Sequence, residues 1–244
     1  PVISTKWWFA STYFVLYIIS PYLNKLLNNL DKQTYKQMLV IFAICWCLIP
    51  TFFRKPFEGN NLIWFIFLYI IAGYIRIYAE KRIKKVGSTY IWLSVVLYVL
   101  TFLSAALFDL IGIRVHYFSL RATMFFEMDQ LPVLLISLLA FIGFLKIKID
   151  YSWLINVISS ATFGIYLIHD NDYVRPFLWK KFFRNATYAD SAFLIPYSLA
   201  VIIIVFLGCT VIELCRIYIF EKQYMNAVNK LSNYLDNIIE HFFS

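Results

Sequence analysis

Three histidines occur in the 244-residue sequence, and His169 is the one whose neighbours suggest chemistry. It closes an apolar segment that begins near Trp153, and Asp170 and Asp172 follow within three positions. An imidazole beside a carboxylate is held in one tautomer and becomes more basic, which suits the removal of a proton from a hydroxyl group. Tyr166 precedes His169 by about one helical turn. We therefore predict His169 as a catalytic residue and Tyr166 as a substrate-binding residue.

A structural role for His169 is an alternative that the sequence leaves open. The helix dipole stabilises a cation near the C-terminal end of a helix, so a histidine at this position can simply cap the segment. It can also orient a substrate without transferring a proton.

A second set of ionisable residues lies in the loop from Asp109 to Gln130, between two apolar segments. The loop contains Arg114, His116, Arg121, Glu127 and Asp129. Charges so close to apolar segments either line a substrate cleft or mark the surface of a bilayer. We predict His116, Arg121 and Glu127 as substrate-binding residues, and the second interpretation stays open.

Other kinds of site are not indicated by the sequence. It has no Gly-rich nucleotide loop, no H-E-x-x-H zinc motif and no G-x-S-x-G nucleophile elbow. The four cysteines lie within apolar segments without metal-ligand spacing (Cys45, Cys47, Cys209 and Cys215). We expect them to be small packing residues, and we predict no metal site. Asn185-Ala186-Thr187 matches an N-glycosylation acceptor, which we interpret as a chance match.

The composition indicates that these residues are positioned in a membrane. Hydrophobic residues make up 61% of the chain and charged residues 15%, whereas a soluble domain carries about 25% charged residues. The net charge of +8 comes from Lys and Arg in short loops between apolar runs. Such loops set membrane topology, so we predict no nucleic-acid partner.

A membrane-spanning helix needs about 20 mostly apolar residues. By that measure the sequence predicts an all-α, multipass transmembrane helical bundle of about seven spans. These are Trp7–Leu26, Met38–Phe53, Leu62–Tyr78, Tyr90–Leu110, Leu131–Leu145, Trp153–His169 and Phe193–Phe220. We expect a kink at Pro21, near the end of the first span. His169 would then end the sixth span, and the loop Asp109–Gln130 would join the fourth span to the fifth.

The distribution of Lys and Arg predicts the orientation. They are slightly more frequent after the first, third and fifth spans and from Arg216 onward, and basic loops stay in the cytoplasm. The strongest contribution comes from residues 76–85, with the pairs Lys81-Arg82 and Lys84-Lys85. We therefore expect the N-terminus outside and the C-terminus inside a plasma (inner) membrane, although the outer linker Asp170–Ala192 is also basic.

The last part of the chain has a different pattern. From Phe220 to Phe242, apolar residues recur at steps of three or four, with Lys and Asn elsewhere around the helix. We predict one transmembrane domain over residues 1–220 and an amphipathic, cytoplasmic tail helix over residues 221–244, lying in the lipid interface.

The segment Ser159–His169 (SSATFGIYLIH) resembles a signature of the acyltransferase-3 family of bacterial integral-membrane acyltransferases. Lys6–Asn24 is similar to the family's mid-chain helix, with an aromatic entry and a proline exit. Leu68–Tyr78 is similar to a later helix of the family, with Gly73 and a basic end. The order and spacing of these segments agree over essentially the whole chain.

Members of that family move an acyl group, often acetyl, from a cytoplasmic donor to hydroxyls of cell-envelope carbohydrates. The resemblance therefore implies an O-acyltransferase with acyl-CoA as co-substrate, a carbohydrate or glycolipid acceptor and no bound cofactor. It also implies that the family's main catalytic histidine and arginine pair lie upstream of Pro1. We accordingly expect this chain to be the C-terminal part of such an enzyme and to be inactive by itself.

Two other functions stay open. A transporter of polysaccharide or lipid-linked sugar usually needs ionisable groups deep within its helices, whereas here Ser, Thr and Tyr lie in the middle of the spans and charges at their ends. The other alternative is a non-catalytic membrane protein that keeps only the acceptor half.

Overall fold

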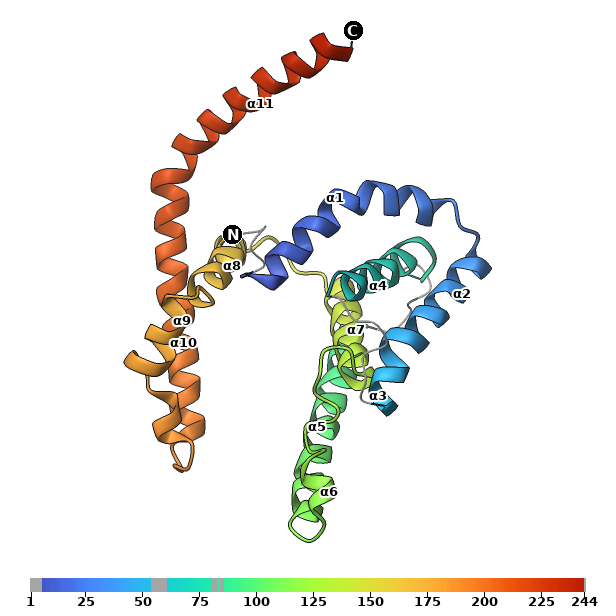
Figure 1. Ribbon diagram of the computed structural model, residues 1–244, viewed down its shortest axis with the longest axis vertical. Coiled ribbons are helices and arrows are strands. Elements are labelled where there is room, and N and C mark those ends of the chain that lie inside the picture. Colours follow the sequence, from blue (N-terminus) through green and yellow to red (C-terminus); the bar gives the residue numbers. More distant parts are fainter. Residues whose placement is uncertain (1–5, 54–60, 80–82, 84–85, 244) are drawn as a thin grey trace. The chain divides into compact units, whose positions relative to one another are not determined.

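A computed structural model describes residues 6–53, 61–79, 83 and 86–243, and these residues form helices, turns and loops without a strand (Figure 1). The chain divides into two compact units, Pro1–Asp150 and Tyr151–Ser244. The basic pairs Lys81-Arg82 and Lys84-Lys85 lie outside the described residues.

The described residues of the first unit form seven α-helices, two of which run on into π-helical turns. Their bounds are α1 Trp8–Asn28, α2 Lys32–Ala43, η1 Ile44–Leu48, α3 Ile49–Phe53, α4 Asn61–Tyr74, η2 Ile75–Ala79, α5 Gly87–Gly112, α6 His116–Ser119 and α7 Leu131–Lys146. The helix α1 continues through Pro21 and is curved along its length (Figure 1). Proline removes one backbone hydrogen bond without ending this helix.

The second unit contains the remaining elements. They are α8 Trp153–His169, α9 Val174–Pro176, η4 Phe177–Phe182, η5 Asn185–Tyr188, α10 Leu194–Cys215, η6 Arg216–Glu221 and α11 Lys222–Phe243. The last three follow one another without a break (Figure 1).

Side chains just before two helices explain where these helices begin. The Asp31 carboxylate accepts hydrogen bonds from the backbone N–H groups of Gln33 and Thr34 and so caps α2. The hydrogen bond from the Thr34 hydroxyl, together with those N–H groups, holds the pKa of Asp31 below its ordinary value. Ser152 caps α8 in the same way by accepting from the N–H of Ile155.

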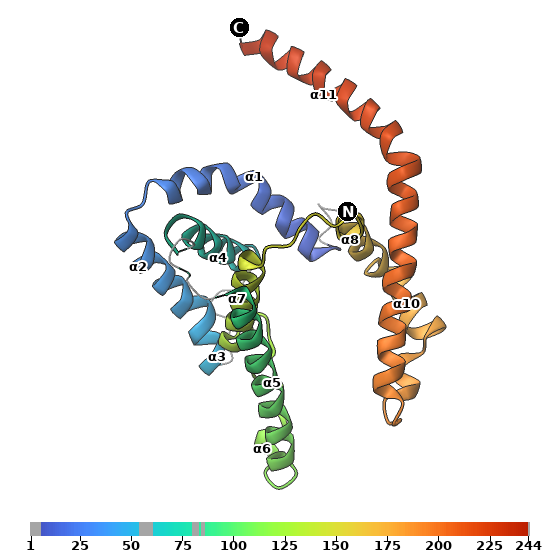
Figure 2. The same ribbon diagram turned by 180° about the vertical axis from the view of Figure 1, so that it is seen from behind.

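Small residues bring α5 and α7 close together, and the two helices lie side by side in both views (Figures 1 and 2). A Cβ atom at Gly87 would lie 2.6 Å from the backbone oxygen of Gly143, which no real side chain tolerates. The Ser94 hydroxyl donates to the Ile136 carbonyl at 3.0 Å. Close backbone approach and a hydrogen bond between helices are the usual means of association in lipid, where apolar surface gains nothing by meeting other apolar surface.

Two buried clusters join the helices of the first unit, one between α1, α2 and α4 and the other between η1, α4 and α7. One is formed by Leu27, Tyr35 and Ile70, and the Tyr35 hydroxyl donates to the Ile70 carbonyl at 2.9 Å. The other joins Cys47 of η1 to Trp64, Phe67 and Leu134. The prediction that Cys47 is a packing residue is confirmed.

The helices agree with the predicted spans to within a few residues at most ends. Among the described helices, four are long and apolar enough to cross a membrane, namely Lys32–Phe53, Asn61–Ala79, Gly87–Gly112 and Leu194–Glu221. Leu131–Lys146 and Trp153–His169 are apolar but shorter. An all-helical membrane fold is therefore confirmed. The total of about seven spans and the position of α11 in the lipid interface stay predictions.

Candidate functional site

His169 ends α8, and the hydrogen bond of its ring defines which nitrogen is left for chemistry. Its Nδ1 lies 2.7 Å from the Ile165 carbonyl oxygen. A carbonyl can only accept, so Nδ1 carries the hydrogen, and in the neutral imidazole Nε2 keeps a lone pair. The Tyr166 ring meets the imidazole edge-on, with 6.3 Å between centroids. The half-buried His169 can therefore accept a hydrogen bond from a hydroxyl group through Nε2.

The partner of His169 differs from the one that the sequence suggested. The tautomer was expected to be set by a neighbouring carboxylate, but the contact comes from the backbone of the preceding helical turn. Asp170 forms an ion pair with Arg175 at 3.2 Å instead. The reason is local geometry, because a side chain at the end of a helix reaches the carbonyl four residues earlier more easily than the residue after it.

The helix that carries His169 is fixed against α10 by one face only. Ala161, Gly164 and Ile165 are buried there, and Cys209 of α10 packs against them. The two small residues that come just before them, Ser159 and Ser160, are exposed. The buried positions follow the three- and four-residue steps of one helix face; Ser159 lies away from that face, and Ser160, four positions before Gly164, lies at its edge.

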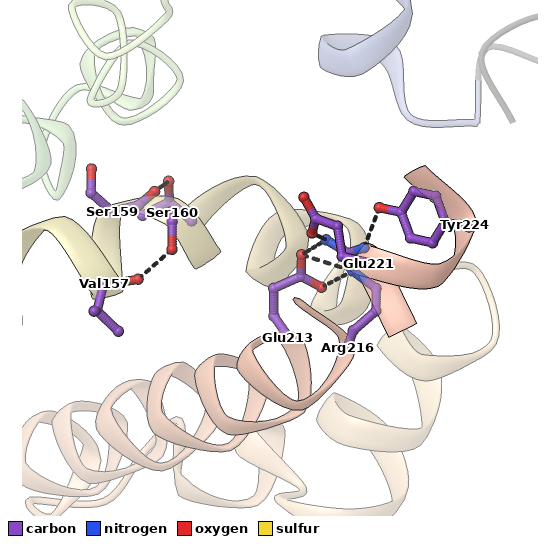
Figure 3. A network of polar contacts seen from close by, with 8 residues as sticks. Val157, Ser159, Ser160, Glu213, Arg216, Glu221 and Tyr224 are labelled. Carbon is purple, nitrogen blue, oxygen red and sulfur yellow. Dashed lines mark hydrogen bonds and ion pairs between the residues drawn. The ribbon is translucent and has the colours of Figure 1, made fainter. Parts of the chain in front are cut away.

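A network of charged and polar side chains lies at the contact between α8 and α10 (Figure 3). Glu213 is only 6% exposed, and it lies against Gly164, whose missing side chain makes room for it. Arg216 donates to both carboxylate oxygens of Glu213, at 2.7–3.0 Å. The same guanidinium contacts Glu221 at 3.1 Å and the Tyr224 hydroxyl at 2.7 Å. Sequence reasoning treated Glu213 and Arg216 as a charged helix end and missed this network.

The ionisable residues predicted in the Asp109–Gln130 loop lie in the first unit and make local contacts. His116 opens α6, is exposed, and has its Nδ1 at 3.2 Å from the Ser119 hydroxyl. The Arg121 guanidinium lies 3.4 Å above the centre of the Tyr117 ring, and Glu127 is exposed. Their role as substrate-binding residues stays a prediction.

Asp129, in the same loop, has an altered acidity. Burial raises the pKa of its carboxyl group above the ordinary value, and the negative charge of Glu127 adds to the effect. The loop therefore holds a carboxyl group that resists ionisation next to one that is exposed.

A cavity of about 670 Å³ in the first unit was not predicted from the sequence. Its polar lining comes from Asn24 and Asn28 of α1, Tyr69 of α4 and Arg76 of η2. An apolar pocket of about 350 Å³ lies beside it and shares Ala72, Ile75 and Phe141 with it. The only sequence signal was the spacing of Asn24 and Asn28, which places both on one face at the end of an apolar span.

Within the described residues, no three His, Cys, Asp or Glu side chains lie together in a way that could hold a metal ion.

Comparison with known proteins gives one match. The sequence model of the acyltransferase-3 family, described as an acyltransferase domain, matches residues 2–214. No curated protein and no solved structure matches the chain.

Proposed function

The chain belongs to the acyltransferase-3 family, and on that premise we propose that it takes part in the transfer of a short acyl group, such as acetyl, from cytoplasmic acyl-CoA to a hydroxyl of a cell-envelope carbohydrate or glycolipid. The family match carries this proposal, because it extends over α1 to α10 nearly completely. Apolar helices long enough to cross a bilayer support a reaction at a membrane.

In the proposed reaction the acceptor oxygen attacks the thioester carbonyl. A carbon–oxygen bond forms, the carbon–sulfur bond breaks, and the proton of the hydroxyl ends on the sulfur of the released CoA. We assign His169 the task of holding the acceptor, since its Nε2 can accept a hydrogen bond from the attacking hydroxyl while Nδ1 stays bonded to the Ile165 carbonyl. This contact aims a lone pair of the hydroxyl oxygen and costs no reorganisation of the ring.

The predicted topology supports an acceptor site at the outer face of the membrane. The loop after the fourth span carries His116, Arg121 and Glu127, and the end of the sixth span carries Tyr166 and His169. Both are assigned to the outer face of the membrane, where envelope carbohydrates are found. We therefore propose that the acceptor binds at the outer face, where each set of residues is predicted to lie, and that the donor arrives from the opposite face.

The buried Glu213 is the one observation that favours the rival function, a transporter. Ionisable groups within membrane helices often carry protons or ions. Here, however, Arg216 occupies both carboxylate oxygens, so the carboxylate is already neutralised by a neighbour on its own helix. The pair is better suited to joining α8 to α10 than to binding a transported ion.

Mass spectrometry of envelope glycans from cells with and without the gene tests the proposal. We expect a hydroxyl-linked acyl mass to be lost with the gene and restored by a plasmid copy. Identical glycans that are merely mislocalised, with no change in acyl mass, would support the transporter and contradict the proposal.

A further inference from the structure

We propose that the cavity at the ends of α1, α4 and α7 is a binding site for the acyl donor, with a phosphate-bearing head at Arg76 and the acyl chain in the adjoining apolar pocket. This assignment rests on the proposed function. It concerns residues that are separate from His169 and from the acidic and basic residues of the Asp109–Gln130 loop.

The polar end of the cavity presents hydrogen-bond donors. The Tyr69 hydroxyl donates to Asn24 Oδ1 at 2.8 Å, which leaves the two N–H groups of the Asn24 amide for a ligand. Arg76 adds a guanidinium, and none of the described residues around the cavity is an Asp or Glu. A concave surface with a cation and amide donors favours an anion such as a phosphate.

The backbone at Arg76 forms one of the π-helical turns of the chain. Arg76 belongs to the π-helical turn Ile75–Ala79, which continues α4. Single π-helical turns occur frequently at functional sites, because the extra residue redirects the side chains that follow. The turn places the exposed Arg76 side chain in the lining of the cavity, although Ile75 beside it is buried.

The apolar pocket begins where the polar cavity ends. It lies between α4 and α7 and is lined mainly by Leu68, Ile71, Leu134 and Leu138. Ser137 is a polar residue in its lining. Its volume of about 350 Å³ and the 670 Å³ of the polar cavity both fall within the roughly 300–1,000 Å³ of small-molecule sites. The two compartments together fit a molecule with an anionic head and an apolar tail.

The predicted topology places this cavity on the donor's side. Asn24 and Asn28 lie at the end of the first predicted span, Arg76 near the end of the third, and Leu145 at the end of the fifth. All three ends are assigned to the cytoplasm, where acyl-CoA is found.

Two chemical sources of such a ligand exist, acyl-CoA and an anionic phospholipid, and binding measurements separate them. The purified protein in nanodiscs of phosphatidylcholine is titrated with acetyl-CoA and butyryl-CoA. Burial of each additional methylene strengthens binding about fourfold, so butyryl-CoA should bind about fifteenfold more tightly than acetyl-CoA.

Variants test separately whether Arg76 binds the phosphate-bearing head and whether the apolar pocket binds the acyl chain. Arg76→Gln should weaken both thioesters by roughly tenfold to a hundredfold, since hydrogen bonds to a charged group are lost. Ser137→Leu should fill the apolar pocket and abolish the preference for butyryl-CoA while leaving acetyl-CoA binding unchanged. Lys25→Gln is the control, because it removes one positive charge from the last turn of α1, next to Asn24 but outside the cavity lining, and it should change neither affinity.

Several outcomes would overturn the assignment. Equal effects of Arg76→Gln and Lys25→Gln would indicate general charge attraction rather than a site. A lipid site would be identified instead by two results together. Neither thioester would bind in nanodiscs that contain phosphatidylglycerol, and native mass spectra would show phosphatidylglycerol bound to the wild type but not to Arg76→Gln. If glycan acylation depends on the gene but neither thioester binds here, the cavity assignment fails and the proposed function stands. If both thioesters bind as expected and acylation does not depend on the gene, the proposed function fails alone.

Discussion

Gly164→Ala tests whether the contact between α8 and α10 depends on the absence of a side chain at this position. A Cβ atom at Gly164 would lie closer than 3.0 Å to Cγ, Cδ and Oε1 of Glu213, a separation that real Cβ atoms essentially never show. The Glu213 side chain is only 7% exposed and is held by Arg216. It therefore cannot turn away without breaking hydrogen bonds to the guanidinium.

The expected cost follows from these contacts. Overpacking of a well-packed contact typically costs about 1–3 kcal/mol, and a loss of hydrogen bonds to a charged group costs a similar amount. We expect about 2 kcal/mol for Gly164→Ala. For a chain of this size that corresponds to a decrease of about 4–8 °C in Tm, measured in detergent micelles by the loss of the monodisperse peak after heating.

The chain offers a matched control in Gly208, which lies on α10 and has no atom within 4 Å of a Cβ placed there. Gly208→Ala removes a flexible residue from a helix without a clash, so it should leave Tm unchanged or raise it slightly. The clash explanation also requires coupling, because in a Glu213→Ala background Gly164→Ala should cost almost nothing. Equal Tm values for Gly164→Ala and Gly208→Ala, or an undiminished cost in the Glu213→Ala background, would refute the reasoning.

Three further measurements test other parts of the structure. His169→Gln in the active enzyme should lower acyl transfer by roughly tenfold at most if the residue orients the acceptor through one hydrogen bond, whereas a loss of about a thousandfold at normal expression would identify it as the general base. Because the pKa of Asp129 is raised in the folded state, ionisation of this carboxyl group destabilises the fold, and stability should fall as pH rises through that raised pKa. Asp129→Asn should therefore raise Tm near pH 7 and leave Tm unchanged at a pH below about 3.9. An equal change in Tm at both pH values would contradict the assignment. Cysteines placed at Lys148 and Thr187, in a background without the four native cysteines, should differ in labelling by an impermeant thiol reagent in intact cells, with only Thr187→Cys labelled; labelling of both positions would reject the predicted topology.

The bounds of most helices could be predicted because they depend on local sequence. The predicted and observed bounds of α8, Trp153 to His169, are identical, since polar residues flank a mostly apolar run without charged residues and Ser152 caps its start. For α2 the apolar run was recognised only from Met38, whereas the helix begins at Lys32. The first turns of α2 are polar, and the cap at Asp31, rather than hydropathy, determines where the helix begins.

The burial of particular faces could not be predicted in the same way. Lipid is as apolar as a protein interior, so an apolar helix has no hydrophobic stripe that reveals which side meets its neighbour. The burial of Ala161 and Gly164, but not of Ser159 and Ser160, is decided by how α10 packs against α8. The same packing places Glu213 against Gly164, although the sequence shows the two residues almost fifty positions apart.

The sequence by itself determined that this protein is a helical membrane protein of the acyltransferase-3 family and that His169 ends one of its helices, because hydropathy, capping and a family signature are properties of contiguous residues. The tertiary structure alone decided that Glu213 is buried against Gly164 and that Asn24, Arg76 and Phe141 surround one cavity. Each of these depends on where a side chain points or on which distant helices meet, and neither is encoded in the order of the residues within a single span.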